Sequence, residues 1–136
     1  MMAGMVPAFD EVARRLACAD VVLEIFRSFD AHDIDGALEF YADDAVFLGV
    51  TGREAIKEKM RAGLAPNAAR RSRHVIGNLQ ASALDSRVML VRYTAVTHTL
   101  DGPGPYPPRS VLDQEQEHRC EPDGTMRVIR HHILWP

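Results

Sequence analysis

The stretch of sequence that decides the fold covers residues 71–100 and reads RSRHVIGNLQASALDSRVMLVRYTAVTHTL. Its apolar and polar side chains alternate with a period of two, which is the pattern of β-strands. One face of the first strand is expected to carry His74, Ile76 and Asn78. A break at 85–86 then separates this strand from a second one over residues 87–100. Antiparallel pairing about this break gives opposed residues whose numbers sum to about 171, so His98 is expected as a neighbour of His74 across the ladder.

The remaining C-terminal sequence continues the same pattern. Residues 101–108 form a loop rich in Gly and Pro, which we expect either to lie free or to act as a lid. A third long strand is expected over 109–121, a hairpin turn over 122–124 and a last strand over 126–135. Consecutive strands with short connections pair antiparallel, so these four strands are expected to make one sheet.

The N-terminal sequence has the spacing of helices instead. One long helix is predicted to end near Asp30, with one apolar stripe facing the protein interior. This stripe is formed by Phe9, Val12, Leu16, Ala19, Leu23 and Phe26, and it is widened in the second half of the helix by Val22, Ile25 and Phe29. Asp30 lies at the flank of this face. Asp33 is a candidate N-cap of a short second helix that runs through Tyr41. A turn at 43–44, a buried strand over 45–50 and a third helix over 53–64 follow.

Helices followed by hairpins predict an α+β fold, and 136 residues predict a single domain over residues 1–136. A helix laid in the concave side of a curved sheet leaves a pocket where the two do not meet. The net charge of −3 favours neither nucleic acid nor an anionic membrane as a partner. The arginines at 70, 71 and 73 are interpreted as a solvated strand edge. Cys18 and Cys120 match neither a disulfide framework nor a zinc motif. Without a signal sequence or a transmembrane run, a cytoplasmic protein is expected.

His74 and Asp30 are the residues to which we assign chemistry. The face of His74 mixes apolar and polar groups, as ligand pockets do. A carboxylate beside a buried helical face needs a partner, and an aspartate that fixes the tautomer of a histidine makes it a competent general base. The alternatives are a hydrogen-bonded, inert core histidine and an Asp30 that only ends the first helix.

Other residues complete the expected pocket. On the third strand, residues 113, 115 and 117 line one face and Gln114, Gln116 and His118 line the other. Either one of these faces enters the pocket, or they form a solvated outer face or a subunit interface. The side chains expected to line the pocket and contact a ligand are those of Phe29, Tyr41, Ile76, Asn78, Val96 and Glu115. The adjacent His131 and His132 point to opposite sides of a strand, so they cannot chelate one metal together.

The segments FDAHD (29–33), FYADDAVF (40–47) and RHVIGN (73–78) resemble SnoaL-like proteins of the NTF2-like superfamily, and the resemblance extends over residues 9–135. It implies a cystatin-like α+β cone, with three N-terminal helices packed in a curved mixed or antiparallel sheet around a deep pocket. It also implies a homodimer or homotrimer.

Within that superfamily, Asp30 and His74 match the aspartate–histidine dyad of the scytalone dehydratase-like branch, whose members carry out β-eliminations. The resemblance implies that His74 removes a proton, that Asp30 orients it and that His98 donates a proton to the leaving group. It implies no cofactor and no metal. The chain has Phe29 and, approximately, Gly49 where the scytalone enzyme has tyrosines, so that substrate is not implied.

We therefore expect a dehydratase-like lyase that acts on a small, mostly apolar or cyclic oxygenated molecule. An isomerase or a polyketide cyclase-like enzyme would use the same base through an enolate. Two alternatives come from other classes: a non-catalytic module that binds a small ligand, and a metal site made of two histidines and one carboxylate.

Overall fold

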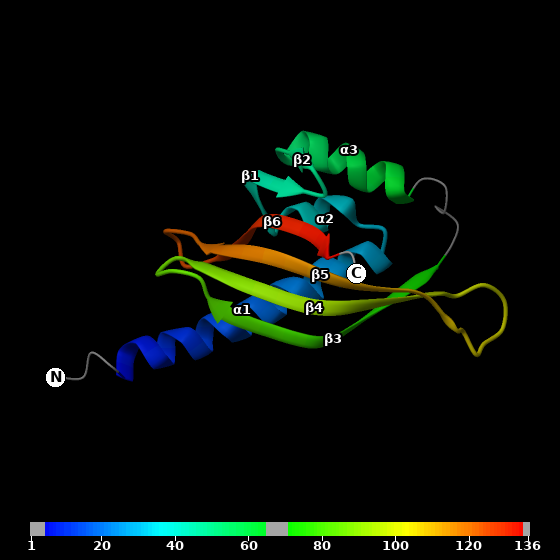
Figure 1. Cartoon of the computed structure of the whole chain (residues 1–136). Helices are drawn as coiled ribbons and strands as arrows, with labels where there is room; N and C mark the ends of the chain where they lie inside the picture. The colour runs from blue at the N-terminus through cyan, green and yellow to red at the C-terminus, as the bar shows by residue number, and fades with distance from the viewer. Residues whose placement is uncertain (1–4, 65–70, 135–136) are drawn as a thin grey trace.

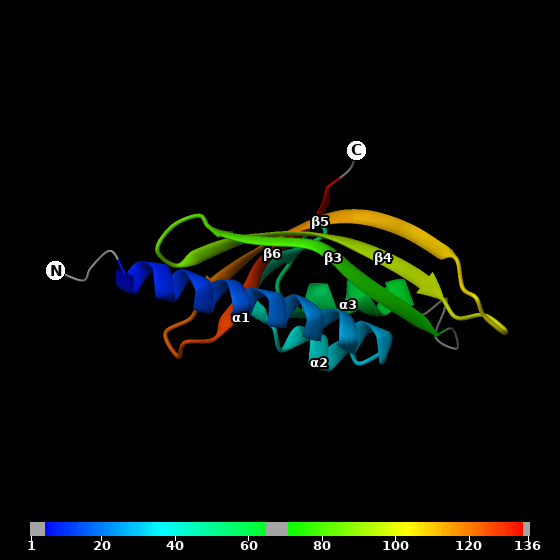
Figure 2. The same ribbon diagram turned by 90° about the horizontal axis from the view of Figure 1, so that it is seen from below.

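One curved sheet with helices along its concave side makes up the fold, as Figures 1 and 2 show. The computed structural model describes residues 5–64 and 71–134. In chain order, the elements of this part are α1 (Met5–Asp30), α2 (Ile34–Leu38), β1 (Tyr41–Phe47), β2 (Val50–Thr51), α3 (Arg53–Leu64), β3 (Ser72–Ala83), β4 (Val88–Thr99), β5 (Pro108–Cys120) and β6 (Met126–Leu134).

The strands form a mixed sheet in the order β2-β1-β6-β5-β4-β3. The four long strands β3 to β6 pair antiparallel with their sequence neighbours, as their short connections predict. β1 adds to β6 in parallel, because α3 and the long strands separate the two in sequence. The α+β prediction is thus confirmed, and β3 is left at one edge of the sheet, beside α1.

The register of β3 and β4 agrees with the predicted sum up to Gly77, which pairs with Thr94. Beyond this point a β-bulge shifts the ladder, and Asn78 adopts a positive φ of 51°. The bulge reverses the alternation, so Leu79 packs against the core while the side chain of Asn78 is exposed. The prediction that Asn78 shares a face with His74 and enters the pocket is therefore wrong.

Helix α1 is rotated relative to the predicted stripe. Three residues of the predicted apolar face, Val22, Ile25 and Phe26, are buried as expected, and Cys18 and Val21 are buried with them. Three others are exposed, namely Val12, Leu23 and Leu16, of which Leu16 is 64% exposed. The side chain of Phe9 lies outside the described residues. The cause is that α1 carries two apolar stripes, and the first turns of the helix extend beyond the sheet (Figure 2). Burial raises the pKa of the Cys18 thiol to about 12, which suits a packing residue.

The segment between α1 and α3 differs partly from the prediction. Asp33 caps α2 as expected, and its side chain accepts a hydrogen bond of 2.9 Å from the backbone N–H of Gly36. The helix ends at Leu38, however, and Tyr41 begins strand β1. The backbone N–H of Val128 on β6 donates to the carbonyl of Phe40 at 2.7 Å, so pairing with β6 replaces a further helical turn. Helix α3 has the predicted bounds.

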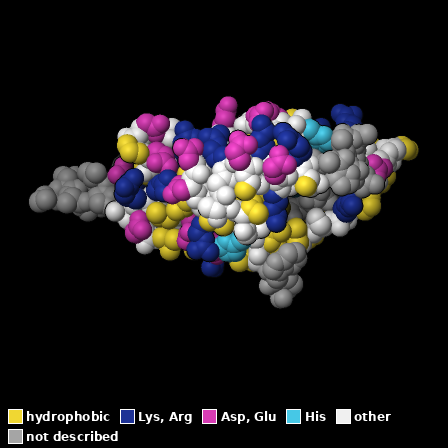
Figure 3. Space-filling view, turned by 90° about the horizontal axis from the view of Figure 1, so that it is seen from above, with side chains coloured by type: hydrophobic (Ala, Val, Ile, Leu, Met, Phe, Trp, Pro, Cys, Tyr) yellow, Lys and Arg dark blue, Asp and Glu magenta, His cyan; other side chains and the backbone are white. Residues whose placement is uncertain are grey.

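Positive and negative side chains are interspersed over the face shown in Figure 3, without a region of one sign. No helix in the described part of the chain is long and apolar enough to cross a membrane.

Candidate functional site

The C-terminal end of α1 brings Asp30 next to the first residues of β3. His32 has a positive φ of 57°, and the N–H of Asp33 donates to the carbonyl of Ser28, so the helix stops directly after Asp30. The Asp30 carboxylate accepts a hydrogen bond from Nδ1 of His74, 44 residues later, at 2.6 Å. The predicted pair is therefore assembled in the structure.

Asp30 is fixed by further contacts. Its second oxygen, Oδ2, accepts from the backbone N–H of His74 at 3.0 Å, and its Oδ1 also accepts from the hydroxyl of Ser72 at 3.4 Å. An ionised carboxylate can only accept, so Nδ1 of His74 carries the proton of this hydrogen bond, and in the neutral form of the ring Nε2 is the nitrogen with a free lone pair. The pair is mostly enclosed: the side chains are 13% exposed at Asp30 and 19% at His74.

Nε2 of His74 is open to a pocket. Within the described residues it has no hydrogen-bond partner, and it is not one of the buried side-chain atoms that lack a partner, so it is accessible from the pocket that His74 lines. The pocket has a volume of about 650 Å³ and lies between α1 and the edge strand β3. Its lining consists of Leu23, Phe26, Arg27, Asp30, Ala31, Arg71, Arg73, His74 and Ile76. The site thus combines a base of fixed tautomer, an apolar wall and several arginines.

His98 does not join this pair. It pairs with Arg73, whereas His74 pairs with Thr97, so the side chains of the two histidines leave the sheet on opposite faces. Nδ1 of His98 donates to the carbonyl of Tyr106 at 2.7 Å. The predicted role of His98 as a proton donor in the pocket is contradicted by this pairing. The loop over 101–108 also contributes no residue to the lining.

The other residues predicted to contact a ligand divide into two groups. Ile76 lines the pocket, and the ring of Phe29 lies 6.5 Å from that of His74. Tyr41 is completely buried away from this pocket, and its hydroxyl bonds to Nδ1 of His131 at 2.7 Å. The structure therefore supports a lining role at the dyad for Ile76 and proximity for Phe29, but not a contact for Tyr41.

Val96 and Glu115 lie on the outer face of the sheet, where they cannot reach the pocket. Val96 pairs with the exposed Val75, on the face opposite to His74. Glu115 bonds to Arg92 at 2.6 Å and lies 3.2 Å from His132 in an outer row of charges. Both predictions are wrong, because the inner face of β5 carries the even-numbered residues Gln114 and Gln116 instead.

The sequence analysis missed several residues of the site. The position of Ser72 could have been predicted, because it lies two residues before His74 and so shares its face of the strand. Phe26 lies four residues before Asp30 and so shares its side of α1, and the Phe26 ring centroid is 5.0 Å from that of His74. Arg71 and Arg73 are exposed at the edge of the sheet, which agrees with the prediction of a solvated strand edge, and both also line the pocket. Their position beside the dyad follows from the packing of α1 against β3, which the spacing does not predict.

A buried polar network lies behind the dyad, on the concave face of the sheet. Oε1 of Gln114 accepts from the hydroxyl of Tyr93 at 2.8 Å and lies 2.7 Å from Nε2 of His131. The amide of Gln116 donates to the Tyr93 hydroxyl at 2.7 Å, and its Oε1 lies 2.6 Å from Nε2 of His118. Burial lowers the pKa of both histidines to about 3, so both are neutral. The network is linked to the dyad through the ring of Phe26, which touches those of Tyr93 and His74.

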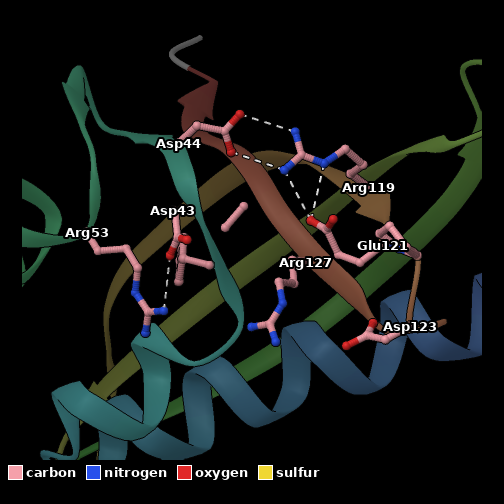
Figure 4. Close-up of a pocket in the computed structure, with 10 residues that line it drawn as sticks. Asp43, Asp44, Arg53, Arg119, Glu121, Asp123 and Arg127 are labelled. Carbon is pink, nitrogen blue, oxygen red and sulfur yellow. Dashed lines mark hydrogen bonds and ion pairs between the residues drawn. The ribbon is translucent and has the colours of Figure 1, made fainter.

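A second cleft, of about 520 Å³, is shown in Figure 4. Its charges are paired with one another: Arg119 contacts Asp44 at 3.1 Å and Glu121 at 3.1 Å, and Arg53 lies 3.5 Å from Asp43. Tyr41 also belongs to its lining. The cleft presents acid–base pairs to solvent but no oriented histidine, so the dyad pocket is the better candidate for chemistry.

The metal alternative required two histidines and a carboxylate together. In residues 5–64 and 71–134, no group of three His, Cys, Asp or Glu side chains is placed to hold a metal ion. His98, which this alternative needed beside His74, faces the other side of the sheet.

Solved structures of similar shape support the fold. ActVI-ORFA from Streptomyces coelicolor matches with a TM-score of 0.83 at 12% identity, over 92% of this chain and 99% of that one. An NTF2-like protein with a cystatin-like fold from Novosphingobium aromaticivorans matches with a TM-score of 0.74 at 18% identity, over 97% and 86%. A protein from Catenulispora acidiphila, solved in complex with S-DNPA, matches with a TM-score of 0.69 at 15% identity, over 94% and 92%. The chain has the NTF2-like, cystatin-like fold that the resemblance implied.

Among proteins with curated descriptions, none matches this sequence closely enough to count as a relative. A family match does exist, and it covers residues 10–132, which include α2, α3, strands β1 to β5, most of β6 and the dyad. The chain therefore belongs to the family of SnoaL-like domains.

Proposed function

We propose that this protein is a dehydratase-like lyase in which His74, oriented by Asp30, removes a proton from a small, mostly apolar or cyclic oxygenated molecule. The observation that carries the proposal is the 2.6 Å hydrogen bond from Nδ1 of His74 to Asp30, with Nε2 open to the pocket. This arrangement supplies a base of defined tautomer beside an apolar wall.

The chemistry requires one base and a route for the leaving group. A C–H bond of the substrate breaks, its proton goes to Nε2, and its electron pair forms a C=C bond as a hydroxide or halide leaves the neighbouring carbon. The imidazolium that forms is stabilised by the Asp30 carboxylate against which it lies. Among the lining residues, no second histidine or carboxylic acid stands opposite His74. The same imidazolium then protonates a departing hydroxyl, which favours elimination of groups on one face of the substrate.

The test is a search for C–H activation that depends on His74. Cyclic ketones with a β-hydroxyl or β-halogen substituent are incubated with the protein in D2O, and loss of the C–H signal is followed by proton NMR. We expect at least one compound to react with the wild type and about 100-fold more slowly or not at all with His74→Asn, since general base catalysis contributes at least that much. Compounds that bind but react equally with both proteins would contradict the proposal.

A non-catalytic binding module is the second candidate. The observation in its favour is the position of His98, which removes the proton donor that the lyase was expected to use. In that case, His74→Asn weakens ligand binding, and no compound of the D2O experiment loses its C–H signal. An isomerase or cyclase would exchange the C–H without releasing a leaving group, so the product distinguishes it from a lyase.

We also propose that the protein is a homodimer or homotrimer. No helix of the described residues covers the outer face of the sheet (Figure 2), and Val75, Val96 and Val111 form a continuous row of paired apolar side chains on it. Val75 and Val111 are exposed in the single chain. Light scattering should give a mass two or three times the chain mass of 15.2 kDa. A mass equal to that of one chain would contradict this proposal.

A further inference from the structure

We propose that the dyad pocket is selective for an organic monoanion, in which an apolar body carries one carboxylate that Arg71 and Arg73 bind. This inference rests on the proposed function of the same pocket and adds the charge of its ligand. Arg71 and Arg73 line the pocket together with His74 and Asp30. Guanidinium groups bind carboxylates by charge-assisted, often bidentate, hydrogen bonds.

The charges around the pocket do not cancel. Arg27 forms an ion pair with Glu24 one turn earlier on α1, and Asp30 is engaged by His74 and Ser72. Within the described chain, neither Arg71 nor Arg73 pairs with a carboxylate; Nη1 of Arg73 donates to the carbonyl of Ser72 at 3.1 Å.

Two guanidinium groups without a carboxylate partner therefore border a pocket that has one carboxylate, that of Asp30, so the lining has more basic than acidic side chains. The chain as a whole carries a net charge of −3. A monoanion would neutralise this local excess.

The second cleft gives a comparison within the same molecule. There, Arg119 and Arg53 both have carboxylate partners, and Nη1 of Arg127 donates to the backbone carbonyl of Glu39 at 2.5 Å (Figure 4). Four carboxylates, from Asp43, Asp44, Glu121 and Asp123, line that cleft. Two of the three arginines that line this cleft, Arg53 and Arg119, are thus paired with acids, whereas neither Arg71 nor Arg73 is at the pocket of the dyad. This difference singles out the dyad pocket as the one that would attract an anion.

The placement of the two kinds of lining suggests how the ligand lies. Leu23 and Phe26 come from α1, and Ile76 from β3, and together they form the apolar wall. Arg73 lies at the start of the edge strand β3, and Arg71 directly precedes it. Arg73 alternates with His74 along the strand, but both arginines are exposed at the edge of the sheet and border the pocket there. A ligand that lies with its apolar body on this wall and its carboxylate toward the start of β3 contacts the apolar residues and the two arginines at once. Its C–H groups then lie beside Nε2 of His74.

The test compares two probes that differ in charge alone, 2-naphthoate and 2-naphthamide. Their affinities are measured by calorimetry, and the site is identified by the NMR signals of the His74 ring. We expect the wild type to bind the acid about tenfold or more tightly than the amide, as charge-assisted hydrogen bonds allow. Salt at about 0.3 M should reduce this preference, because the arginines are exposed to solvent.

Two double variants show whether the preference for the acid comes from Arg71 and Arg73 or from the net charge of the protein. The double variant Arg71→Gln/Arg73→Gln should bind acid and amide with similar affinity. The control Arg61→Gln/Arg130→Gln removes the same charge from exposed, paired arginines outside the pocket and should keep the preference. Equal binding of the two probes by the wild type, including no binding of the acid, would overturn the inference, as would a preference that survives in the double variant.

His74→Asn distinguishes this inference from the proposed reaction. The variant lacks the base but retains both arginines, so it should still prefer the acid over the amide. A protein that prefers the acid yet activates no C–H bond would refute the lyase and leave the anion selectivity standing. A protein that activates C–H bonds of neutral compounds without preferring acids would support the lyase and refute the anion selectivity.

Discussion

Asp30 holds His74 at two points, the ring nitrogen Nδ1 and the backbone N–H, so the carboxylate orients both the imidazole and the strand that carries it. Two hydrogen bonds from one residue restrict rotation of the carboxylate more than one would. The hydroxyl of Ser72 adds a third, longer contact. Nε2 of His74 therefore keeps one direction relative to the pocket, which is a requirement for a general base.

Replacing Asp30 by Asn should test this orientation. The amide can no longer stabilise an imidazolium, and it allows the other tautomer, so turnover of a compound found in the D2O experiment should fall about 100- to 10,000-fold. Asp35→Asn is the matched control, since this exposed carboxylate on α2 pairs with Lys57 away from the pocket. Activity of Asp30→Asn close to that of the control would show that Asp30 has no role in orienting the base.

The sequence predicted the residues of the dyad but not their surroundings. Asp30 and His74 follow from helical and strand periods together with the resemblance, because both lie in regular elements whose spacing is preserved. The prediction for His98 is wrong although the predicted register is right. Before the bulge, paired residues of β3 and β4 have numbers that sum to 171, so His98 pairs with Arg73. Since Arg73 and His74 are adjacent on the strand, His98 and His74 face opposite sides of the sheet. The exposure of Arg71 and Arg73 was predicted, but not their place beside the pocket, because that depends on how α1 packs against β3.

At the scale of elements, the β-bulge in β3 decides which side chains enter the interior. The bulge lies after Ile76, and Asn78 takes the left-handed conformation that allows the extra residue. His74 and Ile76 before it and Leu79 after it can then all face α1. Sequence periodicity does not reveal a bulge of this kind, since the Gly77-Asn78 pair is equally compatible with a regular strand.

Asn78→Val should destabilise the protein by about 1–2 kcal/mol, because a β-branched residue is strained at positive φ. Asn78→Gly is the control, and it should change the stability little since glycine adopts this conformation readily. Urea unfolding followed by circular dichroism measures both. Equal stability of Asn78→Val and wild type would mean that the backbone at this position is regular.

The orientation of α1 shows what apolar spacing alone leaves undecided. The predicted apolar arc contains Val22 and Ile25, which are buried, but also Leu16, which is exposed. Only packing against β3 and the other strands distinguishes the two sides of this wide arc. Helix α3, by contrast, was predicted with its observed bounds. It has a single apolar side, with Ile56 and Met60 buried, and glycine at 52 marks its start.

A pair of alanine substitutions should confirm this orientation. Ile25→Ala removes a fully buried side chain and should cost about 2–5 kcal/mol, whereas Leu16→Ala removes an exposed one and should change the free energy of unfolding by less than about 0.5 kcal/mol. Urea unfolding gives both values. A larger loss of stability for Leu16→Ala than for Ile25→Ala would mean that the Leu16 side of α1 faces the interior.

Over the whole molecule, the interior is more polar than the sequence analysis assumed. Gln114, Gln116, His118 and His131 are buried together with the hydroxyls of Tyr41 and Tyr93. Most of their polar atoms bond to one another, while Nδ1 of His118 has no partner in the described chain. Such a network is stable only while its histidines are neutral, because the interior does not solvate an imidazolium.

Acid should therefore unfold the protein. The pKa of His118 and of His131 is about 3 in the folded chain, below the ordinary value of 6.5, so between these values the unfolded chain binds protons that the folded chain does not. Stability is complete above pH 6.5 and falls on acidification toward pH 3, on the order of 1 kcal/mol per pH unit for each histidine.

Urea titrations between about pH 7 and pH 4 measure this slope. His118→Met removes one of the two groups and should make the slope shallower, whereas His32→Gln, outside the network, should leave it unchanged. A slope that is the same in all three proteins would show that buried histidines do not control acid stability.

The tautomer of His74 tests its role as the general base most directly. It is read from the 15N NMR signals of the ring in the wild-type protein near neutral pH. The Asp30 contact predicts a proton on Nδ1 and none on Nε2, and a mixture of tautomers in Asp30→Asn. A proton on Nε2 of the wild type would mean that the nitrogen facing the pocket cannot accept one, and the assignment of His74 as the general base would fail.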